Sequence, residues 1–83
     1  MSIWKRLMDP KLCKVLEIVK SGEHYHLKKL SELTGVPIAT VSRLVHKLVE
    51  EHILDSITVG KMTFYKVHDS PEVHQLLEEV HDE

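Results

Sequence analysis

The chain contains little of what a disulfide-stabilised domain or an enzyme of this size would need. Its single cysteine excludes an internal disulfide and is typical of a reducing compartment. Its three glycines form no phosphate-binding loop, and no nucleophile stands at a recognisable spacing from a base. We therefore predict that the protein is not an enzyme and uses no cofactor or small-molecule substrate.

Long apolar runs are also missing. No stretch approaches the ~18 apolar residues that a membrane-spanning helix requires. The first nine residues, MSIWKRLMD, lack the uninterrupted apolar core of a signal peptide. These absences predict a cytoplasmic protein with no membrane partner, which would lie in the host-cell cytoplasm if the gene is viral.

The net charge of −2 is small, but it is unevenly distributed. Residues 1–50 carry nine Lys or Arg against five Asp or Glu, whereas residues 51–83 carry two against eight. A basic half followed by an acidic half suits a module that faces DNA, although ordinary surface charge would also produce this asymmetry.

Near its middle, the sequence predicts two short helices that meet at a sharp turn. In the first helix, Leu27, Leu30 and Leu33 recur at helical spacing and predict a buried face. Gly35 favours the left-handed conformation that ends a helix, and Pro37 suits the first turn of the next one.

The second of these helices has one apolar face and one polar face. The apolar face, which we expect to be buried, comprises Ile38, Val41, Leu44, Val45, Leu48 and Val49. The opposite face comprises Ala39, Arg43, His46 and Lys47, with Thr40 and Ser42 at its margins. Small, hydroxylated and cationic side chains that point outward together suit a nucleic-acid groove.

The run TGVPIATVSRLVHKLVEEHIL resembles the second half of a winged helix-turn-helix module of the ArsR and MarR type, found in bacterial and archaeal transcription regulators. The resemblance extends over roughly residues 9–67, and a viral origin would also fit. It implies a recognition helix at about Pro37–Glu51 in the DNA major groove and a wing at about Ile57–Val67. One departure is His52, where such modules commonly place glycine; histidine tolerates a positive φ better than most residues, so the corner can still form.

This reading assigns DNA contacts to two groups of side chains. The candidates for base-edge contacts are Thr40, Ser42, Arg43 and His46, of which Arg43 suits guanine. The candidates for phosphate contacts are Lys28, Lys29, Ser31, Lys47 and Lys61. For Lys61, an ordinary solvated turn lysine is an equally good interpretation.

Two elements are predicted ahead of the motif. Asp9 is a good N-cap and Pro10 a good first helical residue, so we expect a helix from there to Lys20. Its core stripe comprises Leu12, Val15, Leu16 and Val19. Residues 23–26 are expected to form a short strand beside the wing, with Tyr25 pointing inward and its flanking histidines pointing outward.

A hairpin and a final helix are predicted after the motif. Ile57 and Val59 alternate with polar residues before a tight turn at Gly60, and Ser70 can cap a helix that begins at Pro71. The fold class is therefore mainly α with a small β-hairpin, in the order helix, short strand, helix, helix, strand, strand, helix. An extra helical turn at the N-terminus is left open.

Apolar stripes at both ends of the chain predict a homodimer. We divide the chain into an N-terminal apolar segment (1–8), a winged helix-turn-helix domain (9–67) and a C-terminal dimerisation helix (68–83). The expected interface comprises Ile3, Trp4, Leu7, Met8, Cys13, Val73, Leu76, Leu77 and Val80. Packing of Cys13 beneath the N-terminal segment of its own chain is nearly as good an explanation.

The predicted function is sequence-specific binding of double-stranded DNA by a small dimeric transcription regulator, such as a repressor. One alternative is a winged-helix module that binds another protein and no DNA. A second is a metal-responsive, ArsR-like repressor, because His74, Glu78 and His81 share one helical face and could share an ion. The spacing does not match the ligand pattern of such sensors, and the polar flank of an exposed helix accounts for those three residues without a metal, so no metal is predicted.

Overall fold

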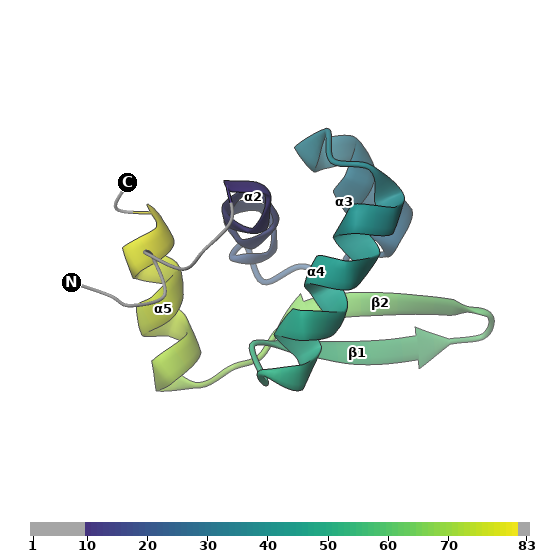
Figure 1. Cartoon of the computed structure of the whole chain (residues 1–83). Coiled ribbons are helices and arrows are strands. Elements are labelled where there is room, and N and C mark those ends of the chain that lie inside the picture. The colour runs from purple at the N-terminus through teal and green to yellow at the C-terminus, as the bar shows by residue number, and fades with distance from the viewer. Residues whose placement is uncertain (1–9, 82–83) are drawn as a thin grey trace.

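Four α-helices and a two-stranded antiparallel β-sheet form the part of the chain that the structure describes (Figure 1). This computed structural model describes residues 10–81. The elements are α2 (Pro10–Val19), α3 (Leu27–Thr34), α4 (Ile38–Glu50), β1 (Leu54–Val59), β2 (Met62–Val67) and α5 (Pro71–His81). The predicted fold class and element order are confirmed. Within this range, no helix combines the length and the apolar character needed to cross a membrane.

The core lies where α2 packs between α5 on one side and the helix-turn-helix unit on the other (Figure 1). The predicted stripe of α2 is confirmed, and Val15, Leu16 and Val19 are completely buried. Burial of one such side chain stabilises the fold by about 1.5–3 kcal/mol. The core comprises Leu12, Val15, Leu16, Val19, Leu30, Val36, Val41, Val45, Leu48, Ile53, Leu54, Tyr65, Val67, Val73, Leu76 and Leu77.

Glycine and two hydroxyl groups close the corner between α3 and α4. Gly35 ends α3 with a φ of 74°, and its N–H donates to the carbonyl of Ser31 at 2.9 Å. The Ser31 hydroxyl donates to the carbonyl of Val36 at 2.7 Å, and the Val36 N–H donates to the Thr34 hydroxyl at 3.2 Å. Pro37 is the N-cap of α4, one position earlier than predicted. The predicted helix-turn-helix corner is thus confirmed.

Two apolar side chains beside this corner lie outside the core. Leu33 is 47% exposed and Ile38 is 49% exposed, so the prediction that they belong to buried faces is wrong. The helix α3 has only eight residues, and Leu30 is its one buried side chain. Val36, in the turn, is only 4% exposed and is the side chain that packs into the core at this corner. Ile38, the first residue of α4, therefore lies beyond the edge of the core.

The helix α4 ends on a left-handed residue that is not glycine. His52 has a φ of 62°, and its N–H donates to the carbonyl of Val49 at 3.0 Å. The Ile53 N–H donates to the carbonyl of Leu48 at 2.9 Å. These two bonds are those of a Schellman ending, and the burial of Ile53 and Leu48 supplies its usual apolar contact. The prediction that histidine permits this corner is confirmed.

The wing is a short hairpin whose two faces differ. The strands pair from Leu54 opposite Val67 to Val59 opposite Met62, and Gly60 takes a φ of 62° in the two-residue turn. Because paired residues share a face, the register determines which side chains lie on each face of the hairpin. The inward face carries Leu54, Val67, Ser56, Tyr65, Thr58 and Thr63, and the outward face carries Asp55, Lys66, Ile57, Phe64, Val59 and Met62.

The segment before α3 pairs with the wing, as predicted, but only as a single β-bridge. Tyr25 donates its N–H to the carbonyl of Tyr65 at 2.8 Å and accepts the Tyr65 N–H at 2.6 Å. The Tyr25 side chain packs against the core, which agrees with its predicted inward orientation. His26 has a role that the strand prediction did not include: its Nδ1 accepts the Lys29 N–H at 3.1 Å and caps α3.

The helix α5 packs on α2 within the single chain. Its first turn is capped by the Ser70 hydroxyl, which accepts the Val73 N–H at 3.2 Å. Val73, Leu76 and Leu77 are only 5–6% exposed, because they join the core residues of α2. These three are therefore core residues, which corrects their assignment to a dimer interface, and Cys13 is half-buried against the same core. The other expected interface residues lie outside the described part of the chain: Ile3, Trp4, Leu7, Met8 and the side chain of Val80, as does the expected cap Asp9.

Replacement of His52 by glycine is expected to stabilise the fold. The left-handed conformation costs a side chain roughly 1–2 kcal/mol, and part of that gain is lost because glycine is freer in the unfolded chain. We expect the free energy of unfolding to rise by about 0.5–1 kcal/mol, as measured by urea denaturation. The control is His52→Ala, which keeps a β-carbon at the same φ and should give no such gain. A glycine variant no more stable than the alanine variant would contradict the strain argument.

Candidate nucleic-acid interface

The helix α4 is buried on one face and exposed on the other. Val41, Val45 and Leu48 are 0–1% exposed and anchor the buried face. The exposed side chains are Ala39, Arg43, His46 and Lys47, with Thr40 and Ser42 half-buried at the margins. The predicted division of this helix is confirmed except at Ile38, which is exposed. Because the buried residues fix its rotation, the two cationic side chains must point into solvent.

His46 is held against its own helix. Its Nδ1 lies 2.9 Å from the carbonyl oxygen of Ser42, one turn closer to the N-terminus of α4. A carbonyl oxygen only accepts hydrogen bonds, so Nδ1 is the donor. The bond keeps the imidazole on the outward face of α4, on the same side of the helix as Arg43 three residues earlier.

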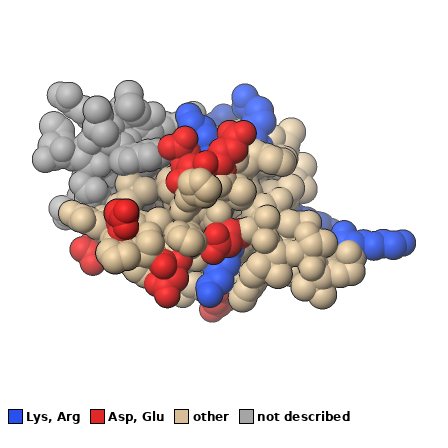
Figure 2. Space-filling model, turned by 90° about the horizontal axis from the view of Figure 1, so that it is seen from below, with Lys and Arg blue, Asp and Glu red and all other residues tan. Residues whose placement is uncertain are grey.

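Further basic residues flank this face. Lys28 and Lys29 are exposed in the first turn of α3, and Lys61 is exposed in the turn of the wing. Figure 2 shows basic surface at the far end of the wing. Ser31 differs from the other predicted phosphate contacts, because its single hydroxyl proton is used by the Val36 carbonyl. Ser31 is therefore a residue of the turn and not a phosphate donor in this structure.

The outward face of the wing is apolar. Val59 is 63% exposed, Met62 is 47% exposed and Ile57 is 38% exposed. Phe64 pairs with Ile57 in the register and meets the ring of His26 edge-on, with ring centroids 5.8 Å apart. Most of the wing surface in Figure 2 is correspondingly uncharged. The wing thus combines one lysine at its tip with a surface of apolar side chains.

Two aspartates near the base of the wing are paired with histidines. Both carboxylate oxygens of Asp55 lie 3.1 Å from Nδ1 of His68, and Oδ1 of Asp69 lies 2.8 Å from Nε2 of His74. The hydrogen bond from His74, aided by its charge, holds the pKa of Asp69 below its ordinary value. Figure 2 shows acidic side chains spread over the body of the domain, away from the far end of the wing.

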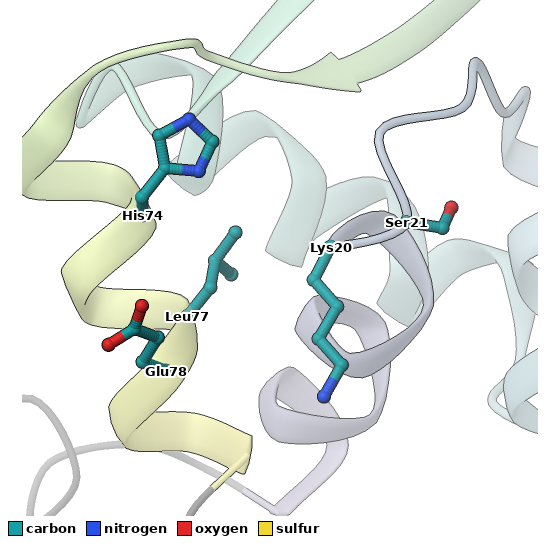
Figure 3. Close-up of a pocket in the computed structure, with 5 residues that line it drawn as sticks. All are labelled: Lys20, Ser21, His74, Leu77 and Glu78. Atoms are coloured by element: carbon teal, nitrogen blue, oxygen red, sulfur yellow. The ribbon is translucent and has the colours of Figure 1, made fainter.

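A hollow of about 450 Å³ lies between α2 and α5. Its lining comprises Lys20, Ser21, His74, Leu77 and Glu78 (Figure 3). Leu77 reaches from α5 toward α2, whereas Ser21 points away from the gap. Lys20 pairs with Glu17 at 3.2 Å, and His74 already binds an aspartate. The polar groups therefore do not converge on one point, as a specific small-molecule site requires.

The possible metal ligands on α5 are not gathered into a site by the part of the chain that the structure describes. Nε2 of His74 is engaged by Asp69, and the side chain of His81 lies outside the described residues. Among the side chains that the structure describes, which end at Glu78, no group of three or more His, Cys, Asp or Glu is placed to hold a metal ion.

An exposed cationic face on α4, a tight helix-turn-helix corner and a short hairpin define a winged-helix DNA-binding domain of a transcription regulator. The model of the IclR helix-turn-helix domain matches residues 11–56, which is more than half of the sequence. The chain therefore belongs to the family of IclR helix-turn-helix domains. The matched segment runs from α2 into β1.

Solved structures of transcription regulators share this fold. Reduced HlyU from Vibrio cholerae N16961 superposes with a TM-score of 0.78 at 16% identity, covering 96% of this chain and 82% of that one. The predicted DNA-binding transcriptional regulator from E. coli gives 0.80 at 16% identity, with coverages of 96% and 83%. The MarR family regulator SPO1453 from Silicibacter pomeroyi DSS-3 gives 0.76 at 11% identity, with coverages of 96% and 57%. Identities this low establish the fold alone, and they confirm the winged helix-turn-helix resemblance. No curated protein matches the sequence.

Sequence reasoning missed two features of this surface. The exposed apolar pair Val59 and Met62 lies within an alternating pattern that predicted strands, but alternation does not say whether an outward face will be covered. The cap on α3 was missed because His26 is not one of the usual N-cap residues. Its position three residues before Lys29, at the start of an amphipathic run, was the available signal.

The substitution His74→Ala is expected to raise the pKa of Asp69 toward its ordinary value, because it removes the hydrogen bond and charge that favour the carboxylate. A depressed folded-state pKa means that the stabilisation is present above the ordinary carboxyl pKa and is lost as the pH falls through the folded value. The measurement is an NMR titration of the Asp69 carboxyl carbon. Glu78→Gln, on the same helix but outside the pair, serves as the control. An unchanged Asp69 titration in the alanine variant would disprove the pairing.

Proposed function

We propose that the chain binds double-stranded DNA sequence-specifically inside the cell as a small homodimeric transcription regulator that represses by covering its site. The observation that carries this proposal is the division of α4 between a core-facing side and an exposed side with Arg43, His46 and Lys47. A helix in this setting fits the major groove, which is about 12 Å wide. The wing then lies over the neighbouring backbone or minor groove.

The contacts fall into two classes. Thr40, Ser42, Arg43 and His46 would meet base edges, and the guanidinium of Arg43 matches the O6 and N7 acceptors of guanine. Lys28, Lys29, Lys47 and Lys61 would meet phosphates, which position the domain without specifying sequence. These lysines lie on α3, on α4 and in the turn of the wing, that is, on the groove-reading helix and on the elements before and after it in the chain. A local basic surface of this kind is sufficient in a chain with a net charge of −2.

A dimer would place two copies of α4 about 34 Å apart on successive major grooves of a palindromic site. Because three residues of α5 are already used in the core, the proposed interface rests on the N-terminal segment of residues 1–8. Its apolar members are Ile3, Trp4, Leu7 and Met8. We propose that Cys13 and Val80 also belong to this interface. A chain of 83 residues also has a small core, which dimerisation would extend.

One observation favours a second candidate function. Ile57, Val59 and Met62 expose apolar surface on the wing, as a protein-binding module would. In that reading, the domain docks on a protein partner and Arg43 and Lys47 are ordinary solvated charges. Binding of duplex DNA by the wild type separates the two functions.

The double variant Arg43→Ala/Lys47→Ala is expected to bind DNA roughly 10–100-fold more weakly than the wild type, because it loses one base contact and one phosphate contact. The slope of log affinity against log salt should become shallower by about 1. The measurement is fluorescence anisotropy over a salt series, on a duplex that the wild type selects from a random pool.

The matched control for this experiment is Lys11→Ala/Lys14→Ala, which removes the same charge from exposed positions on α2. It should bind within about twofold of the wild type, because loss of distant surface charge is screened by salt. Equal losses in the two double variants would rule out α4 as the recognition helix. A wild type that binds no duplex at low salt would favour the protein-binding function.

The substitution Trp4→Asp is expected to weaken the dimer by about 100-fold or more, because it places a charge in an apolar interface. Sedimentation equilibrium of the full chain measures this directly. The control is Val59→Asp, which places the same charge on the exposed wing and should leave the dimer intact. Dissociation by the wing variant alone would assign the interface to the wing instead.

A further inference from the structure

The hydrogen bond between His46 and Ser42 fixes which ring nitrogen of this histidine can meet a ligand. Nδ1 must donate to the Ser42 carbonyl oxygen over their 2.9 Å separation. A neutral imidazole carries one ring proton, so Nε2 is then a bare nitrogen that can only accept a hydrogen bond. His46 is exposed, and Nε2 is the ring nitrogen left for an external partner.

The same bond also positions the ring along the helix. Ser42 lies one turn before His46, so the imidazole is drawn back over the N-terminal half of α4. That half is the part of a recognition helix that reads base edges. Arg43, a donor with a planar fork, lies between the two residues on the same exposed side.

Few groups in a DNA major groove can donate to a bare ring nitrogen. The N4 amine of cytosine and the N6 amine of adenine donate hydrogen bonds there, whereas guanine N7 and O6 and thymine O4 are acceptors. Phosphate oxygens also only accept. We infer that His46 reads the exocyclic amine of a cytosine or an adenine, beside a guanine read by Arg43; this inference rests on the proposed DNA binding by α4.

The recognition helix then presents a donor and an acceptor one turn apart. A single G·C pair offers the complementary pattern, because guanine carries two acceptors and its cytosine carries an amine. Two neighbouring base pairs with guanine in one and an amine in the next satisfy it equally. His46 is thus a specificity-determining residue whose hydrogen-bond direction is set by the backbone of its own helix.

The first experiment examines the ring without DNA. In the ¹⁵N-labelled full chain at pH 8, where histidine side chains are ordinarily neutral, NMR correlation of the ring nitrogens with the ring carbon-bound protons identifies the protonated nitrogen. The His46 signals are assigned by their loss in His46→Ala. We expect a proton on Nδ1 and a bare Nε2. A majority form with the proton on Nε2 would overturn the inference whatever the DNA result.

The second experiment is a double-mutant cycle across the interface, at the same pH. In the selected duplex, each cytosine is replaced in turn by 2-pyrimidinone and each adenine by purine, which lack the amine. At one position, the wild type should lose about fivefold in affinity, the effect of one hydrogen bond, while His46→Ala loses less than twofold. The alanine variant serves as the control for any change that the analogue causes in the duplex itself.

A variant of opposite hydrogen-bond direction completes the test. Lysine only donates, so His46→Lys should change the preferred base at that position from one with an amine to guanine or thymine. If the wild type binds the duplex but no analogue distinguishes it from His46→Ala, the assignment of His46 fails and DNA binding stands. If the wild type binds no duplex, both the assignment and the proposed function fail.

Discussion

The burial of Val41, Val45 and Leu48 fixes the rotation of α4 about its axis, and the exposed face of the domain depends on that rotation. Successive residues of a helix differ by about 100°, so a shift of one position would turn Arg43 off the outward face to the edge of the buried one. Truncating Leu48 to alanine would cost about 2–5 kcal/mol, a large share of the 5–15 kcal/mol available to a small domain. The packing that stabilises the fold therefore also determines the direction in which the cationic side chains of α4 point.

The helix α2 links the helix-turn-helix unit to the other elements of the domain. It contacts α5 on one side and α3 on the other, and the wing is tied to the segment after it by the bridge between Tyr25 and Tyr65. All the elements of the described chain therefore share one core. The C-terminal helix α5 belongs to that core, although its single apolar stripe read equally well as a surface for a second subunit. A stripe in the sequence shows that a face must be covered, and only the fold shows what covers it.

Strong local signals predicted most of the architecture. Gly35 predicted the corner and Ser70 predicted the start of the last helix, whereas the left-handed residue at position 52 was expected from the resemblance to winged helix-turn-helix modules, which commonly place glycine there. The errors at Leu33 and Ile38 have a common cause, because helical periodicity assumes that the core extends the full length of each helix. Hydrogen bonds such as that from His46 to the Ser42 carbonyl leave no trace in residue spacing, so the direction of hydrogen bonding on the exposed face of α4 follows only from the three-dimensional fold.

The left-handed conformation of His52 also bears on how stiff the joint between α4 and the wing is. Glycine at this position would have broad freedom in φ and ψ and would act as a loose hinge. A histidine has only a small left-handed basin, and the two hydrogen bonds of the helix ending hold it there. Helix and hairpin are consequently held in one relative orientation, so less conformational entropy would be lost if both took part in binding. The backbone strain at His52 thus accompanies a fixed orientation of α4 relative to the hairpin.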